Sequence, residues 1–378
     1  MKITKAAAKI KQGNLTIYST SLFVSDLLEN NFFQIDRLDA SSRSEQGYQR
    51  VLDERRKKKF ADYLVNAWKE GDAFLPTSVF LATDKNIDYN KENNTITFDT
   101  DEIGAFNVVD GQHRISGLIE AVEKVPELKS FQIPVNIAIN LDEISQMCHF
   151  LIVNSTQKAV DRAIVQQIHA RLTNMIEFEE IPTLPKWIQR QVLKGEDRDA
   201  LVITEFLNNE NTSPWKDKIL MANSQNKNFT IKQNSFVNSI KKYILSANNP
   251  IMRTDDTLKR NKILKNYWQA ISNILNKNGI LENSALFKTI GLDLFNQVSP
   301  AVFSQLFLNK DFKVETIEDL FKKAFNKLDA DYIKMSFPNF WMKGKDASGL
   351  NQAAVRKYAT ELNKAISISK DELTDIEL

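Results

Sequence analysis

The chain has 378 residues and carries 50 Lys and Arg against 48 Asp and Glu, a formal net charge of +2. A charge this small excludes binding to polyanions by bulk attraction, so any contact with a nucleic acid needs a local basic patch. Hydrophobic residues make up 42% and charged residues 26%. These proportions exclude a disordered chain, a collagen-like fibre and a disulfide scaffold.

Cysteine and histidine are scarce in this sequence. Cys148 is the one cysteine, which allows neither an internal disulfide nor a Cys-rich metal site, and 3 histidines are too few for a His-rich centre. No apolar run approaches the ~20 residues that cross a bilayer. The basic N-terminus is not followed by an apolar segment with a cleavage site, so no signal peptide is expected. We expect a reduced, cytoplasmic protein that does not contact a membrane.

Strand and helix patterns alternate through the first half of the chain. Helical spacing of apolar residues predicts helices, and short apolar or alternating runs predict strands between them. In chain order the predicted elements are a helix over 52–67, a strand over 77–82, a hairpin strand over 95–98, a strand over 106–109, a helix from 115, a strand over 133–139, a helix capped by Asp142 and a further helix from about 160. This order belongs to a mixed α/β domain.

From about residue 170 helical patterns dominate, and their connectors are rich in Asn, Ser and Lys. The predicted helices lie over 258–275, 285–295, 317–328 and 352–366. We place a domain boundary at Gly195. The predicted fold class is α+β, with a mixed α/β domain over residues 1–195 and a mainly helical domain over residues 196–378.

The segment Asp110-Gly111-Gln112-His113-Arg114 stands between an apolar strand and a helix. Gly111 allows a close backbone approach or a positive φ angle. The unpaired amides at the start of the helix favour an anion, and His113 and Arg114 add donors for phosphate oxygens. Asp110 could orient His113, hold a metal ion or fix Arg114, and Gln112 could donate to a phosphate or read a base edge. The alternative is a polar turn in which Asp110 caps the helix and Arg114 forms a surface ion pair.

This segment is similar to the signature of the DGQHR-domain proteins, and four other stretches resemble elements of that family in the same order. They are Gln46–Arg50 followed by Arg55 and Arg56, similar to its GYQR element; Leu75–Val79, similar to its LP strand; Phe150–Lys158, similar to its F-x-x-(I/V)-N-x-x-Q segment; and Leu207–Lys216, similar to its SPW stretch. The resemblance extends over most of the chain.

The family includes DndB-type proteins of DNA phosphorothioation systems and relatives in other DNA-modification and antiphage defence clusters. Its core is thought to resemble the ParB/sulfiredoxin fold, in which a short Gly-x-(His/Arg)-Arg loop at a helix N-terminus binds a nucleotide phosphate. By this resemblance Gly111, His113 and Arg114 face the phosphate, whereas Asp110 and Gln112 depart from that loop.

Other residues from the family elements are candidates for the same nucleotide site. The full candidate set is Gly111, Gln112, His113 and Arg114 of the loop, Gln49 and Arg50 upstream, and Asn154, Gln157 and Lys158 between two predicted helices. The ligand would be ATP or another nucleotide with Mg²⁺, although nothing in the sequence requires a cofactor. The alternatives are an ion pair between Arg50 and Asp110, and a helix C-cap and turn at Asn154.

Three basic clusters could contact a nucleic-acid backbone. They are Arg55 with Arg56, Lys259 with Arg260, and Lys343 with Lys345, the last beside Trp341. The alternative for each cluster is an ordinary solvated face.

Three functions fit these patterns. The first is a DNA-associated regulatory or accessory protein of a DNA-modification or defence system, which the resemblance implies. The second is a nucleotide hydrolase or DNA-nicking enzyme, in which Asp110 positions a metal ion or water and His113 assists. The third is an assembly module for other defence proteins, with a homo-oligomer as a further option. Asp110 is the one carboxylate in the motif, whereas a two-metal nuclease needs several, which favours binding over catalysis.

Overall fold

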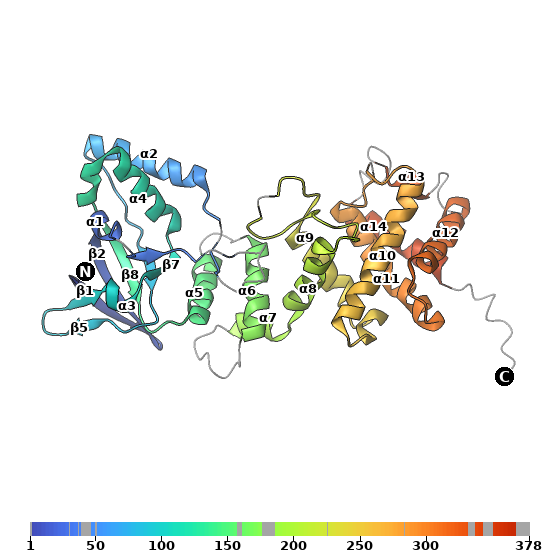
Figure 1. Cartoon of the computed structure of the whole chain (residues 1–378), viewed down its shortest axis with the longest axis horizontal. Coiled ribbons are helices and arrows are strands. Elements are labelled where there is room, and N and C mark those ends of the chain that lie inside the picture. The colour runs from blue at the N-terminus through green and yellow to red at the C-terminus, as the bar shows by residue number, and fades with distance from the viewer. Residues whose placement is uncertain are drawn as a thin grey trace. The chain divides into compact units, whose positions relative to one another are not determined.

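The computed structural model describes residues 2–29, 31–36, 38, 47–49, 51–156, 161–175, 186–224, 226–282, 284–331, 337–342 and 351–367. Contacts divide the chain into two compact units, Met1–Leu193 and Lys194–Leu378. The division lies beside the boundary predicted at Gly195, and the assignment of two domains stays a prediction. The α+β class is confirmed, because a mixed sheet fills the first unit and helices dominate the second (Figure 1).

An eight-stranded mixed sheet runs through the described part of the first unit, in the order β3-β7-β4-β8-β2-β1-β6-β5. Its strands are β1 (Lys2–Gln12), β2 (Leu15–Phe23), β3 (Phe33–Gln34), β4 (Val79–Ala82), β5 (Asp88–Asn90), β6 (Thr95–Asp99), β7 (Phe106–Asp110) and β8 (Gln132–Ala138). β3 is parallel to β7 and β4 to β8, and the other neighbours are antiparallel.

The first strand was missed by the sequence patterns. β1 is long enough to pair twice: Lys2–Ala6 lies against β6, and Ala7–Gln12 forms a hairpin with β2 that turns at Gly13. Its second half is exposed and carries lysines, so it lacks the apolar alternation by which a strand is recognised.

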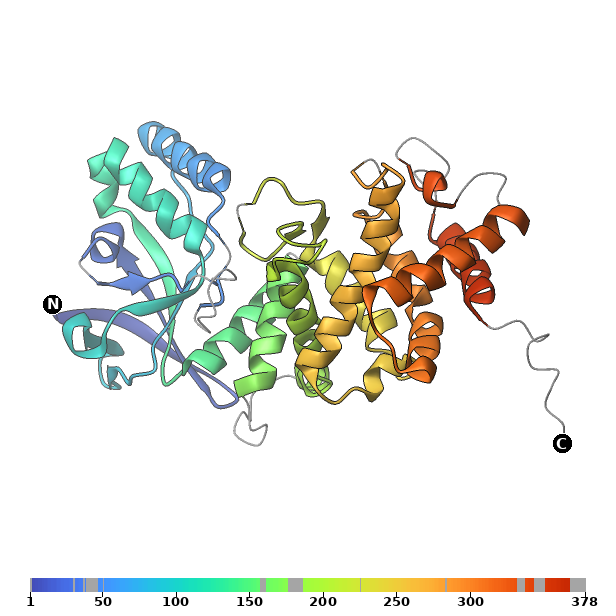
Figure 2. The same cartoon turned by 45° about the vertical axis from the view of Figure 1, so that its right-hand side comes forward.

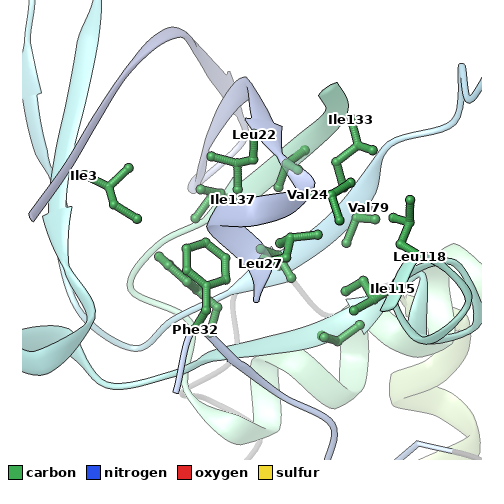
Figure 3. Packing of buried hydrophobic residues seen from close by; sticks show 14 of the residues in the cluster. Ile3, Leu22, Val24, Leu27, Phe32, Val79, Ile115, Leu118, Ile133 and Ile137 are labelled. Atoms are coloured by element: carbon green, nitrogen blue, oxygen red, sulfur yellow. The ribbon is translucent and has the colours of Figure 1, made fainter. Parts of the chain in front are cut away.

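Two helices lie side by side on one face of the sheet (Figures 1 and 2), α2 (Glu54–Glu70) and α4 (Gln112–Lys124). Asp53 caps α2 by accepting hydrogen bonds from two backbone amides, and Gly71 ends it with a φ of +77°. The apolar side chains of both helices and of the strands form one buried cluster. Figure 3 shows its centre, where Ile115 and Leu118 of α4 lie near Val79 of β4.

Of the other described helices of the first unit, α5 and α6 are the longest, with 14 residues each. These other helices are α1 (Val24–Leu27), α3 (Thr100–Ile103), a 3-10 helix over Pro126–Ser130, α5 (Glu143–Thr156), α6 (Arg162–Met175) and α7 (Lys186–Leu193). Asp142 caps α5 as predicted, because its Oδ1 accepts from the amide of Ser145 at 2.7 Å.

The second unit packs helices around aromatic side chains. They are α8 (Glu196–Asn209), α9 (Gln233–Ser239) with a π-helical turn over Ile240–Ile244, a 3-10 helix over Pro250–Arg253, α10 (Thr257–Lys277), α11 (Thr289–Asn309), α12 (Val314–Asp331), α13 (Phe337–Phe340) and α14 (Gln352–Ile366), with a parallel strand pair β9 (Ile219–Leu220) and β10 (Ile231–Lys232). Trp215, from the SPW stretch, is fully buried and lies edge-on against Trp268 and Phe236. That stretch therefore builds the core of this unit.

The four predicted helices of this half are present, but the helix predicted over 285–295 has other bounds, because α11 continues to Asn309. The helix predicted from residue 285 begins at Thr289. Ala285 instead bonds to the carbonyl of Trp341, and a Cβ on Gly291 would lie 2.6 Å from the carbonyl oxygen of Ala285. The chain before the helix thus folds back tightly against it. Among the described helices of the whole chain, none combines the length and the apolar character of a membrane span.

Candidate functional site

A β-bulge at the end of β7 decides which face of the sheet Asp110 occupies. Val108 pairs with Leu81 and Asp110 pairs with Phe80, so Val109 is an extra residue in β7. In a regular strand residues 108 and 110 would point to the same face, and Val108 is fully buried in the core. The bulge turns Asp110 to the opposite face, where its cross-strand partner Phe80 also lies.

Gln49 supports this bulge. Its side chain is 2% exposed, and its Nε2 donates to the carbonyl oxygens of Val108 at 2.7 Å and of Val109 at 2.8 Å. A buried carbonyl without a partner is costly, and a bulge disrupts the ladder that would otherwise supply one. Gln49 therefore supports the motif through its backbone, while its predicted contact with a nucleotide stays a prediction.

Gly111 follows at the N-cap of α4 with a φ of +108°. A Cβ at this position would lie 3.2 Å from Nη2 of Arg114 and 3.2 Å from Cγ2 of Val79. Both the backbone conformation and the close packing favour glycine here. The sequence-based expectation for this residue is confirmed.

Asp110 and Arg114 form an ion pair, with 2.7 Å between Oδ2 and Nη2. They are one helical turn apart, and their side chains are 28% and 20% exposed. Three roles were considered for Asp110, and this ion pair corresponds to the one in which Asp110 fixes Arg114. The pair is reached by solvent, so its contribution to stability is small, at about 1 kcal/mol or less.

His113, in the first turn of α4, connects this helix to the start of α2. Its Nε2 accepts a hydrogen bond of 3.0 Å from the backbone amide of Asp53, and the Asp53 side chain accepts from the amides of Arg55 and Arg56. The start of α2, with its two arginines, is thus tied to the motif.

Asp110 and Arg114 line a cavity of about 1030 Å³. Its other walls are the tip of the β1–β2 hairpin, residues 76–78 before β4 with Phe80 of β4, Asn136 of β8, and one side of α5 with His149, Ile152 and Val153. Nδ2 of Asn136 donates to Oγ of Ser78 at 2.9 Å. Burial lowers the pKa of His149 below its ordinary value, so this imidazole is uncharged at neutral pH.

Sequence reasoning found two of these cavity residues and missed the others. Ser78 and Phe80 alternate with the buried Val79 and Leu81, and that alternation predicts a common face for them. His149, Ile152 and Val153 are spaced i, i+3 and i+4 along one side of a helix. Both signals were readable, but nothing in the sequence indicates that the two surfaces meet.

The other predicted nucleotide contacts lie apart from the cavity lining or outside the described residues. Nδ2 of Asn154 donates to the carbonyl of Phe150 within α5 at 2.8 Å. Gln112, the first residue of α4, is buried. The residues not described are Arg50, Gln157 and Lys158, together with Lys343 and Lys345 of the predicted DNA contacts.

The predicted basic clusters that are described differ in exposure. Arg55 and Arg56 are exposed at the start of α2, and neither has a carboxylate at ion-pair distance within the described residues. The next residue, Lys57, is half-buried. Its Nζ forms ion pairs with the carboxylates of Glu54 at 2.8 Å and Glu120 at 3.4 Å. In the second unit Lys259 is exposed, whereas Arg260 is half-buried and its Nη1 lies 3.7 Å from Sδ of Met252.

A second hollow of about 510 Å³ lies at the other end of β7, and its lining includes Asp36, Asp84, Asp142 and Glu143. Glu143 is paired with Arg171 at 2.6 Å. Over the whole described part of the chain, no three His, Cys, Asp or Glu side chains are grouped closely enough to hold a metal ion.

The single cysteine is expected to be inert in the folded protein. Cys148 is buried, and burial raises the pKa of its thiol to about 12. Because the thiolate is the reactive form, a thiol-specific disulfide reagent at pH 8 should label Cys148 only as fast as the protein unfolds. The check is the labelling rate with and without denaturant, and fast labelling of the native protein would contradict this assignment.

Comparison with known families gives one match. Residues 6–184 match the model of the DndB family, described as DNA-sulfur modification-associated. No curated protein and no solved structure matches the chain. The matched range contains the bulge, Gln49, the motif, α2 and the whole cavity lining.

Proposed function

We propose, from the match of residues 6–184 to the DndB family of DNA-sulfur modification-associated proteins, that this chain is a DNA-associated regulatory or accessory protein of a DNA-modification system. It binds DNA directly and acts together with other proteins of that system. The match over residues 6–184 agrees with the resemblance of the motifs, and it supports DNA as the partner without identifying the surface that binds it.

The observation that carries the proposal is the exposed basic start of α2. Arg55 and Arg56 project from the first helical turn, and neither guanidinium lies at ion-pair distance from a described carboxylate, although the Asp53 carboxylate attracts Arg56 at longer range. The hydrogen bond between His113 and the amide of Asp53 fixes this turn to the motif. Lys58 and Lys59 continue the exposed basic run.

The cavity is the proposed site for a nucleotide. Arg114 is the cationic group on its described lining, so the phosphate predicted for the DGQHR loop would lie there. Asp110 is already bound to Arg114, which leaves it poorly placed to act alone as a metal ligand or base. The geometry therefore supports binding more than hydrolysis.

Duplex DNA binding should depend on salt and on α2. Each neutralised phosphate contributes about −0.9 to the slope of log affinity against log salt concentration, so three to five contacts give roughly −3 to −4.5. In the double variant Arg55→Glu/Arg56→Glu the slope should flatten by about 1.8, if both residues contact phosphates. Fluorescence anisotropy of a labelled duplex at several salt concentrations measures both quantities.

The matched control is Lys91→Glu/Lys129→Glu, which changes the net charge equally at two exposed positions elsewhere in the first unit. Its slope should equal that of the wild type. If the wild type does not bind duplex DNA at low salt, the proposed function fails. If both double variants behave alike, DNA binds another face.

A further inference from the structure

The cavity carries almost no net charge. Among the described residues that line it, Arg114 is the one permanent cation, Asp110 is the one carboxylate, and they are 2.7 Å apart. His149 is uncharged because burial lowers its pKa. A nucleoside triphosphate carries three or more negative charges, and a site for it needs several cations or a metal ion to balance them. The described lining is therefore neutral overall, and the Arg114 guanidinium is the one cationic group that it can offer to a phosphate.

The polar groups of the lining offer both donors and acceptors. Asn136 and Ser78 bond to each other through Nδ2 and Oγ, which leaves the serine hydroxyl hydrogen and Oδ1 of the asparagine without a partner in the described part of the chain. His149 also makes no hydrogen bond to a described residue. Mixed donors and acceptors of this kind match the edge of a nucleobase better than they match a phosphate, which only accepts.

The rest of the lining is apolar and comes from separate elements. Ile10, Leu15 and Ile17 come from the β1–β2 hairpin, and Ile152 and Val153 come from α5. Phe80 adds an aromatic ring next to Asp110 in the sheet register. Ile10 is 37% exposed although it is a large aliphatic residue. Apolar side chains from two directions with a few polar groups between them are typical of sites for flat heteroaromatic ligands.

We propose that this cavity takes a single nucleotide unit, with the base against the apolar residues, its edge at Ser78 and Asn136, and one phosphate at Arg114. The volume of about 1030 Å³ is slightly above the ~300–1,000 Å³ that is typical of ligand sites. The inference deepens the proposed function and rests on it for the choice of a nucleic-acid ligand. The nucleotide comes either from the free pool or from a DNA strand that presents an unstacked base.

The first test compares ligands that share a base and differ in charge. The four deoxynucleosides, their 5′-monophosphates and their 5′-triphosphates are titrated into the full chain by isothermal calorimetry without metal ions. For at least one base we expect the nucleoside to bind and the monophosphate to bind up to ~10-fold tighter than the nucleoside. The triphosphate should bind less than ~3-fold tighter than the monophosphate. Triphosphates that bind over 100-fold tighter than monophosphates would overturn the proposal, as would no binding of any nucleoside or monophosphate.

Variants separate the base from the phosphate. Asn136→Ala and Ser78→Ala should each weaken the nucleoside and the monophosphate by the same factor of ~3–10. Arg114→Gln should remove only the gain from the phosphate. Thr97→Ala is the control, because its hydroxyl bonds to Thr4 on β1 outside the cavity. Ser78→Ala removes one oxygen from the residue before β4, so it remains informative if Asn136→Ala fails to fold. If neither variant changes nucleoside affinity, the assignment is wrong.

Competition identifies the source of the nucleotide. If a strand presents the base, a single-stranded oligonucleotide should displace the bound monophosphate, and Asn136→Ala should weaken both. If the pool supplies it, the two should bind together. The outcome of this test is independent of α2: a chain that binds duplex DNA but no nucleoside or monophosphate keeps the proposed function and loses the cavity ligand. A chain that binds monophosphate but no DNA loses the proposed function.

Discussion

Replacing Gln49 by Leu should lower the free energy of unfolding of the first unit by about 2–4 kcal/mol, because two buried carbonyls lose their donor at a cost of ~1–3 kcal/mol each. The two carbonyls belong to Val108 and Val109 at the bulge. Leu fills a similar volume, so loss of packing contributes little. The bulge should then relax, and Asp110 should lose its fixed place beside Arg114.

The matched control is Gln34→Leu. Gln34 also bonds to β7, through Nε2 to Oδ1 of Asn107 at 2.6 Å, but its side chain is exposed. Its loss should change stability by no more than ~0.5 kcal/mol. Hydrogen exchange of the β7 and β4 amides measures the effect inside the first unit, independently of how the second unit unfolds. Equal protection in both variants would show that Gln49 does not hold the bulge.

Replacing Gly117 by Val should destabilise the first unit by about 3 kcal/mol through overpacking. A Cβ at this position would lie 2.7 Å from Cδ1 of Phe60 and 3.0 Å from the carbonyl oxygen of Lys57. The phenyl ring can move, but the backbone of α2 cannot shift without separating the two helices. Separation would also break the bond from the Asp53 amide to His113, so DNA binding should weaken together with stability.

Ser116→Val is the control, since it places the same valine side chain on the same helix at a partly exposed position. Its cost should stay near the helix-propensity difference, below ~1 kcal/mol. Thermal unfolding followed by far-UV circular dichroism, with DNA affinity at fixed salt, compares the two. A Gly117→Val protein as stable as Ser116→Val would mean that α2 and α4 are not in close contact.

The sequence by itself determined the local elements of the motif region and the family that residues 6–184 resemble. Strand periodicity located β4, β6, β7 and β8, and helical periodicity located α2, α4 and α5, because each depends on the spacing of neighbouring residues. Gly111 could be predicted for the same reason, since a positive φ is a local property. The order of the motifs pointed to the family that residues 6–184 match.

Only the tertiary structure decided what these elements do to each other. The bulge in β7 depends on pairing with β4, so the face that Asp110 occupies could not be obtained from alternation, which predicts the wrong one. Gln49 reaches the bulge from 59 residues away in sequence, and its supporting role follows from the two carbonyls that it meets there. The cavity brings β1, β2, β4, β8 and α5 together, and contacts between residues this distant in sequence are set by packing rather than by local pattern. That is why His149 and Asn136 joined the site only when the fold was known.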